Sequence, residues 1–154
     1  MSEAKLDAKD RAILESLQKN GRATYAELAE GVQLTVSSAR ERVLKLEREG
    51  LIRGYAADLD AEKLGLPVTA FVSVNTSNND SKLSLERFPE VEDCYSIAGD
   101  DNLLLKVRAA SPRVLNRFLE SLLEIDGVLG TRSTIVLETR FEGRPLPLPE
   151  VHPE

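Results

Sequence analysis

The spacing of hydrophobic residues along the chain changes near Leu64. Upstream of this point, apolar side chains recur every three or four positions, which is the spacing of the buried face of an amphipathic helix. From Val68 to Asn75, aliphatic side chains alternate with Thr, Phe, Ser and Asn, as in a strand with one buried face. The change of spacing predicts an N-terminal helical domain and a C-terminal domain built on a sheet.

Capping residues predict two short helices at the start of the chain. Asp7 is placed to cap a helix that ends at Asn20-Gly21. Thr24, followed three residues later by Glu27, is a capping box and predicts a second helix from about Tyr25. The first helix buries three apolar side chains: Ile13, Leu14 and Leu17.

A third helix is predicted from about Val36 to Glu49, with Thr35 as its N-cap and Gly50 as its stop. At 100° per residue, four side chains form its packing side: Val36, Ala39, Val43 and Leu46. The opposite side carries Ser38, Arg42, Lys45 and Glu49, and the flank between the two carries Ser37, Glu41, Leu44 and Arg48. Hydroxyl groups near the N-terminal end and cations further along suit a helix that enters the major groove of DNA.

The residues after this helix decide between two interpretations. A plain helical hairpin with a solvated polar face would explain the helix pair equally well. A Gly stop followed at once by the strand-like run Leu51 to Tyr55 is typical of winged helical domains. The sequence therefore favours a winged helix-turn-helix domain, with a strand or an extended connector from Ile52 to Asp60.

The second half of the chain predicts a βαββαβ order. This is the ferredoxin-like arrangement, an antiparallel sheet with two helices on one face. The uncovered face would carry Thr, Ser and aliphatic side chains, which is too apolar for water and predicts dimerisation. The expected elements are strands Val68 to Asn75, Val91 to Ala98, Leu103 to Ala109 and Thr131 to Phe141, and helices Ser81 to Phe88 and Ser111 to Gly127.

Composition narrows the functional classes. The 154 residues carry a formal charge of −6, which argues against a protein that coats nucleic acid without specificity. The sequence has no long apolar run and no leader before Leu6, so neither a membrane span nor a secretory signal is expected. A single cysteine, Cys94, permits no internal disulfide and indicates the cytoplasm.

No catalytic residue, metal site or cofactor is predicted. The only histidine, His152, lies in the Pro-rich tail, so a His-dependent relay or metal site cannot be assembled within one chain. Cys94 lies inside a predicted strand and is expected to be a small buried hydrophobe. Asp7 and Asp10 are interpreted as capping and helix-dipole residues rather than metal ligands.

The chain resembles the Lrp/AsnC (feast/famine) transcription regulators of bacteria and archaea. In the N-terminal half the matching residues are Leu6-Asp7, Asp10, Ile13, Leu14, Leu17, Gly21-Arg22, Glu27-Leu28-Ala29, Arg42-Val43, Leu46-Glu47, Gly50, Ile52, Gly54-Tyr55 and Leu64-Gly65. In the C-terminal half they are Cys94-Tyr95-Ser96, Gly99-Asp100, Leu104 to Arg108 and Thr131 to Thr134. The resemblance implies an α+β protein that binds double-stranded DNA as a homodimer, with further assembly into a tetramer or octamer.

Four segments follow from the pattern and the resemblance together. Residues 1–50 form the helix-turn-helix DNA-binding domain, and residues 51–65 form a strand or linker. Residues 66–142 form a ferredoxin-like (RAM-type) domain that binds a small effector and oligomerises. Residues 143–154 form an extended Pro-rich tail.

The candidate site residues fall into two groups. The DNA-binding candidates are Thr24, Thr35, Ser37, Ser38, Glu41, Arg42, Lys45 and Arg48. The resemblance places an amino-acid or related effector at a loop and the start of the last strand, where a carboxylate suits its ammonium group and amides and hydroxyls suit its carboxylate. The effector candidates are Ser96, Gly99, Asp100, Asp101, Asn102, Leu103, Thr131, Ser133 and Thr134.

Several residues depart from the family pattern. Asn102 stands where an acidic residue is usual and Leu103 where an aromatic one is frequent, so the effector need not be a leucine-like amino acid. Gln33 stands at a turn position where Gly is common, which would cost roughly 1 kcal/mol if the left-handed conformation is kept. Glu41 and Leu44 replace residues that are frequently basic, which weakens the phosphate contacts of one subunit and favours avidity.

Two alternatives remain at this point. One is an architectural protein of the same fold that organises DNA with little sequence preference. The other is an enzyme similar to tetrapyrrole decarboxylases of related layout, which would require histidine and clustered arginine in a pocket.

Overall fold

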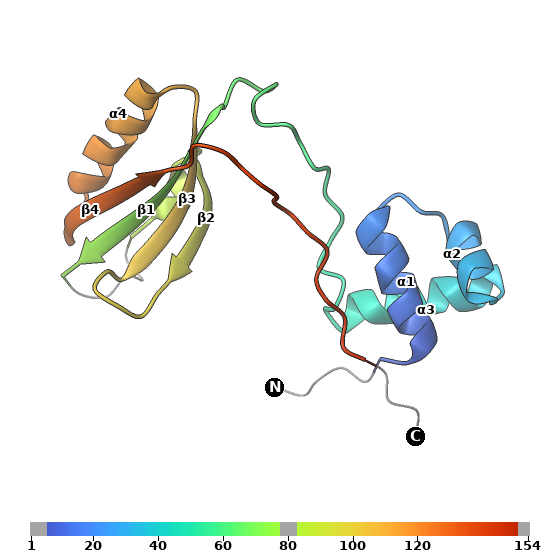
Figure 1. The fold of residues 1–154 in the computed structure, drawn as a ribbon. Coiled ribbons are helices and arrows are strands. Elements are labelled where there is room, and N and C mark those ends of the chain that lie inside the picture. The colour runs from blue at the N-terminus through green and yellow to red at the C-terminus, as the bar shows by residue number, and fades with distance from the viewer. Residues whose placement is uncertain (1–5, 78–82, 151–154) are drawn as a thin grey trace. The chain divides into compact units, whose positions relative to one another are not determined.

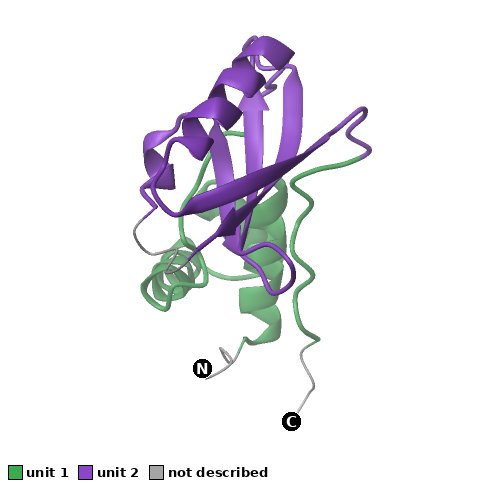
Figure 2. Cartoon of the chain, turned by 90° about the vertical axis from the view of Figure 1, so that its left-hand side faces the viewer, with its two compact units in different colours: residues 1–58, 141–154 green, residues 59–140 purple. Residues whose placement is uncertain are grey.

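The computed structural model describes residues 6–77 and 83–150, and it divides into two compact units (Figures 1 and 2). Unit 1 comprises residues 1–58 and 141–154, and unit 2 comprises residues 59–140. The C-terminal segment therefore belongs with the N-terminal helices rather than with the sheet that precedes it, a grouping that the sequence did not indicate.

Unit 1 contains the three expected helices, α1 (Ala8–Lys19), α2 (Tyr25–Val32) and α3 (Val36–Arg48). Each begins at its predicted cap. The Asp7 carboxylate accepts from the amides of residues 9 and 10 at 2.9 and 2.8 Å. The Thr35 hydroxyl accepts from the amide of residue 38 at 3.2 Å.

The capping box of α2 is complete. The Thr24 hydroxyl accepts from the Glu27 amide at 3.3 Å, and the Glu27 carboxylate accepts from the Thr24 amide at 2.6 Å. The Thr24 amide and the Thr24 hydroxyl, which also donates to the Glu27 carboxylate at 2.9 Å, lower the pKa of Glu27. The helix ends at Gln33, whose φ of 54° and ψ of 53° are left-handed, as expected for a position where Gly is common.

The core of unit 1 joins all three helices. Its buried side chains are Ile13, Leu14, Leu28, Val43 and Leu46, and among the partly buried residues packed on them are Leu17, Ile52 and Leu148. Leu148 comes from the C-terminal segment, so the hydrophobic core of the helical unit includes a residue from the other end of the chain.

The segment after α3 is the extended connector rather than the strand. Gly50 adopts a φ of 73° and ends the helix as expected. Residues 53–60 have no strand pairing in the described chain, and residues 61–65 form a turn. The Tyr55 hydroxyl donates to the Glu47 carboxylate of α3 at 3.0 Å. Burial and this bond raise the pKa of Tyr55 to about 12.

Unit 2 is a four-stranded antiparallel sheet with the order β2-β3-β1-β4. The strands are β1 (Val68–Thr76), β2 (Val91–Ser96), β3 (Leu103–Ala109) and β4 (Val128–Ile135). Helix α4 (Pro112–Leu123) covers one face, with its Ser111 cap and the buried side chains of Leu115, Phe118 and Leu122 (Figure 1). This strand order is that of the ferredoxin-like arrangement, which confirms the predicted fold class.

Four elements differ from prediction in their boundaries. Helix α4 ends at Leu123 rather than at Gly127. The helix expected from Ser81 to Phe88 is a single 3₁₀ turn, η2 (Leu85–Arg87), and residues 81 and 82 lie outside the described residues. The strand expected to reach Ala98 ends at Ser96, where the chain turns toward Asn102. The last strand covers 128–135 rather than 131–141, because its partner β1 extends only to Val68. Strand limits of this kind are set by the neighbour, which local sequence does not report.

Cys94 is exposed, which contradicts its expected burial. Cys94 lies on β2 and pairs with Leu105 of β3. Strand β2 is an edge strand, so one of its sides has no neighbouring strand in the described sheet. An inward place in the alternation therefore does not guarantee burial at an edge.

Replacing Gln33 with Gly should raise the free energy of unfolding by about 0.5–1 kcal/mol, because Gly adopts the left-handed conformation without a Cβ clash. Chemical denaturation followed by helical circular dichroism measures the change. Gln33→Ala keeps the Cβ and should bring no gain. Equal effects of the two substitutions would show that the backbone at Gln33 is not strained.

Candidate functional site

The outward face of α3 is rotated from the predicted one. Ala39, Val43 and Leu46 are buried, but Val36 is 52% exposed. The packing side is therefore centred on the other three residues, and Ser37, Glu41 and Arg48, which were predicted to lie on a flank, point away from the core. The prediction failed here because an apolar residue in the first turn was assigned to the packing side.

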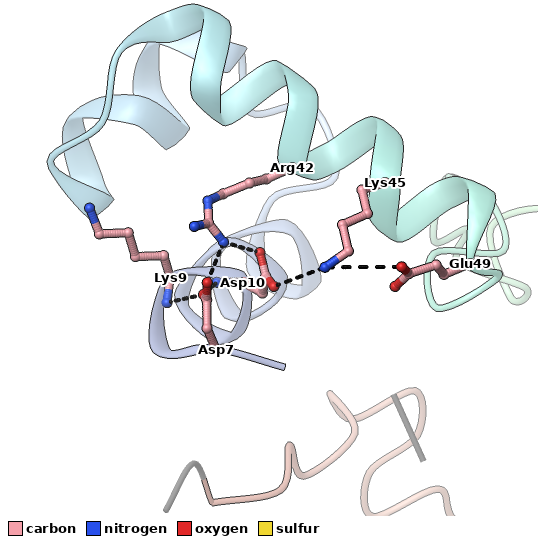
Figure 3. A network of polar contacts seen from close by, with 6 residues as sticks. All are labelled: Asp7, Lys9, Asp10, Arg42, Lys45 and Glu49. Carbon is pink, nitrogen blue, oxygen red and sulfur yellow. Dashed lines mark hydrogen bonds and ion pairs between the residues drawn. The ribbon is translucent and has the colours of Figure 1, made fainter. Parts of the chain in front are cut away.

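Arg42 lies on the side of α3 that faces α1 rather than on the predicted outward side (Figure 3). Its Nη1 atom donates to Asp7 Oδ2 and to Asp10 Oδ1, both at 2.6 Å. Lys45 Nζ lies 4.0 Å from Asp10 Oδ2 and 4.0 Å from Glu49 Oε1. Two acidic residues at the start of α1 thus bind two cations of α3.

The acidic and basic side chains of this network compensate one another's charge. Asp10 is only 2% exposed, so its carboxylate depends on Arg42 and Lys45 for compensation. Asp7 and Asp10 raise the pKa of Arg42. Burial raises the pKa of Asp7, but bonds from the Asp10 amide and from Arg42 outweigh it, so this pKa lies below its usual value.

The hydroxyl groups gather at the N-terminal end of α3. The Thr35 hydroxyl lies 3.1 Å from Ser37 Oγ and donates to Ser38 Oγ at 2.9 Å. Thr24 is occupied in the capping box of α2. An open depression over α3 is lined by Asp7, Leu34, Ser38, Glu41, Arg42, Leu44, Lys45 and Arg48.

Two exposed residues of α3 were missed by the sequence prediction. Val36 was assigned to the core, and Arg40 was given no role although it is exposed one turn further along the same side. The spacing of four residues between them is the signal that could have identified this second outward row.

The candidate effector loop connects β2 to β3 and is hydrogen-bonded to the end of β1. The Asn102 side chain accepts from the Thr76 amide at 2.7 Å, and the Asn102 amide donates to the Val74 carbonyl at 3.0 Å. Asn75 Nδ2 donates to the Asp100 carbonyl at 3.0 Å. Asn102 is therefore occupied in fixing the loop.

An ion pair joins this loop to β4. Arg132 Nη2 donates to the Asp101 carboxylate, and Arg132 remains 67% exposed. The sequence prediction included Asp101 but not Arg132. A carboxylate of the loop and a guanidinium of β4 thus lie side by side, next to the exposed Asp100.

The other predicted effector residues are distributed unequally. Thr131 pairs with Val74, close to the loop, and Ser133 and Thr134 follow it along β4. Ser96 lies on β2, at the opposite edge of the sheet from β4. Leu103 is buried in the core of unit 2, so its side chain does not face the loop surface.

The described residues contain neither a group of three or more His, Cys, Asp or Glu placed to hold a metal ion nor a helix that is long and apolar enough to cross a membrane.

Replacing Arg42 with Ala should lower the free energy of unfolding by about 2–3 kcal/mol, because it removes the main cation bound to the buried Asp10. Arg48→Ala, on the exposed side of the same helix, should change it by less than about 0.5 kcal/mol. Urea denaturation of the two variants makes the comparison. Losses of equal size would show that the network does not hold the helices together.

Comparison with known proteins agrees with both units. Residues 6–53 match the winged helix-turn-helix DNA-binding domain, and residues 69–146 match the Lrp/AsnC ligand binding domain. The HTH-type transcriptional regulator LrpA of Mycobacterium tuberculosis is 40% identical over 148 residues, which cover 94% of this chain and 97% of the relative. The leucine-responsive regulatory protein of Escherichia coli is 34% identical over 140 residues, covering 86% and 85%.

Solved structures show the same arrangement of elements. A transcriptional regulator from Neisseria meningitidis in complex with L-Met has a TM-score of 0.87 and 34% identity, covering 93% of this chain and 97% of the other. The feast or famine regulatory protein from M. tuberculosis complexed with L-methionine has a TM-score of 0.85 and 39% identity, covering 91% and 97%. The chain belongs to the Lrp/AsnC family of transcriptional regulators.

Proposed function

We propose that this transcriptional regulator reads double-stranded DNA with the exposed side of α3 and changes its DNA binding when an amino acid or related metabolite binds unit 2. The supporting observation is the geometry of α3. Hydroxyl groups of Ser37 and Ser38 lie at its N-terminal end, and Lys45 and Arg48 lie further along. Hydroxyls suit base edges and cations suit phosphates when a helix enters the major groove with its N-terminus first.

The DNA contacts differ from those predicted in one important respect. Arg42 is bound to two carboxylates of α1, so we assign it to holding α3 in position rather than to a phosphate. Thr24 and Thr35 act first as helix caps. We propose Ser37, Ser38, Lys45 and Arg48 as the DNA-contacting set, with Glu41 at its centre disfavouring phosphate nearby.

Two cations, Lys45 and Arg48, give one copy of the chain few phosphate contacts, which favours DNA binding by more than one copy. The face of the sheet opposite α4 carries Phe71 and Tyr95, which are 37% and 51% exposed. Pairing two such faces would bury these aromatic side chains and present two α3 helices to two half-sites. We propose a cytoplasmic homodimer that assembles further into a tetramer or octamer.

The effector is proposed to bind beside the loop between β2 and β3. L-Methionine is present in the two related structures, and a free amino acid carries one ammonium and one carboxylate group. Asp100 and Asp101 suit the ammonium group, and Arg132 with the loop amides suits the carboxylate. No catalytic activity is proposed, since this function requires only binding.

DNA binding should depend on Lys45 and Arg48 through phosphate contacts. With DNA from the promoter of its own gene, Lys45→Ala or Arg48→Ala should each reduce the slope of log affinity against log salt by about 1. Gel-shift titration at several salt concentrations measures the slope. Lys63→Ala, an 85% exposed lysine of unit 2, should leave the slope unchanged.

Two results would contradict the proposal in different ways. If the promoter DNA is not retarded at low salt, with or without amino acids, the chain does not bind this DNA. Equal affinity for promoter and random DNA would instead indicate an architectural DNA organiser.

A further inference from the structure

The C-terminal tail lies along α1 through defined contacts. Gln18 Nε2 donates to the Leu146 carbonyl at 3.2 Å, and the Leu146 amide donates to Gln18 Oε1 at 2.6 Å. Arg11 Nη1 donates to the Pro149 carbonyl at 2.9 Å. The tail therefore runs antiparallel to α1 and is bound to it at two points.

The spacing of these contacts matches the geometry of both segments. Arg11 and Gln18 are seven residues apart, so they share one face of α1 and are separated by about 10 Å along its axis. Leu146 and Pro149 are three residues apart, which in an extended proline-rich segment spans about 9 Å. The tail thus fits two turns of the helix without being bent.

The sequence of the tail suits this docking. Prolines at 145, 147 and 149 restrict the backbone before it binds, which lowers the entropy lost on docking. Between them the two leucines differ in environment. Leu148 packs on the core of unit 1, whereas Leu146 is 73% exposed and uses only its backbone.

Helix α1 therefore contacts two different partners from neighbouring residues. Asp10 binds Arg42 of α3, and Arg11, the next residue, binds the tail. The tail in turn continues directly from β4, which carries Arg132, through residues 136–140. Pro147 to Glu150 lie beyond both matched domains.

We propose that the tail is a docked strap that completes the DNA-reading unit and gives the ligand-binding unit a second attachment to it. The first attachment is the connector after Asp58. Through the strap, a change at β4 acts on α1 and so on the Arg42 contact that positions α3. The transmission of a change from β4 to α3 rests on the proposed function, whereas the docking of the tail on α1 does not.

Two single substitutions of the full chain test the strap. Leu148→Ser removes the partly buried side chain that packs on the core of unit 1, and Leu146→Ser alters the neighbouring exposed leucine while leaving the backbone contacts possible. Hydrogen exchange at the amide of residue 146 reports docking, because this amide is bonded to Gln18 only when the tail is in place. Gel-shift titration with and without L-methionine reports the transmission.

The strap predicts slow exchange at residue 146 in the unaltered chain and in Leu146→Ser, and at least tenfold faster exchange in Leu148→Ser. It also predicts that the change in DNA affinity caused by L-methionine falls to less than twofold in Leu148→Ser only, with its binding of L-methionine retained.

Two results would overturn the proposal. Exchange at residue 146 of the unaltered chain as fast as in an unstructured peptide would show that the tail is not docked. An unchanged L-methionine response after release of the tail would show that the strap transmits nothing. A chain that bound no DNA would overturn the proposed function, and the exchange rates would still decide whether the tail is docked.

Discussion

The bond between Arg42 and the buried Asp10 fixes the position of α3, the proposed DNA-reading helix. Asp10 is 2% exposed and would be costly to bury alone, so α3 must remain where its guanidinium can reach that carboxylate. Hydrophobic packing of Val43 and Leu46 brings the helices together, but packing tolerates rotation and sliding. The short ionic bonds to two residues of α1 select one orientation, and this orientation presents Ser37 and Arg48 outward.

Helix α1 consequently does more than fill the core. One face holds α3 through Asp7 and Asp10, and another holds the C-terminal tail through Arg11 and Gln18. The tail is the continuation of β4, so the strand that carries Arg132 leads along the backbone into a segment that is hydrogen-bonded to α1. The position of α3 within the three-helix unit in this way depends on the C-terminal tail, which follows the ligand-binding domain.

Local signals predicted much of this fold. The capping box at Thr24 and the alternation of β1 depend on neighbours in sequence, and both are present as expected. Gln33 keeps the left-handed conformation, a point that the sequence had left open. The errors arose where distant parts decide. Val36 stays exposed because core packing selected another side of α3. Strand β4 ends near the start of its partner β1. Arg132 was missed because its partner Asp101 is 31 residues away. The docking of Leu148 on the N-terminal helices had no local signal at all.

In the proposed function, the Asp10–Arg42 bond positions α3 for DNA. A double-mutant cycle of Asp10→Asn, Arg42→Gln and both together, measured as DNA affinity below the unfolding temperature, tests it most directly. We expect each single substitution to weaken DNA binding, and the two effects to be non-additive, with a coupling of about 1 kcal/mol or more. Additive effects, or an unchanged affinity in Asp10→Asn, would contradict it and would return Arg42 to the role of an independent phosphate contact.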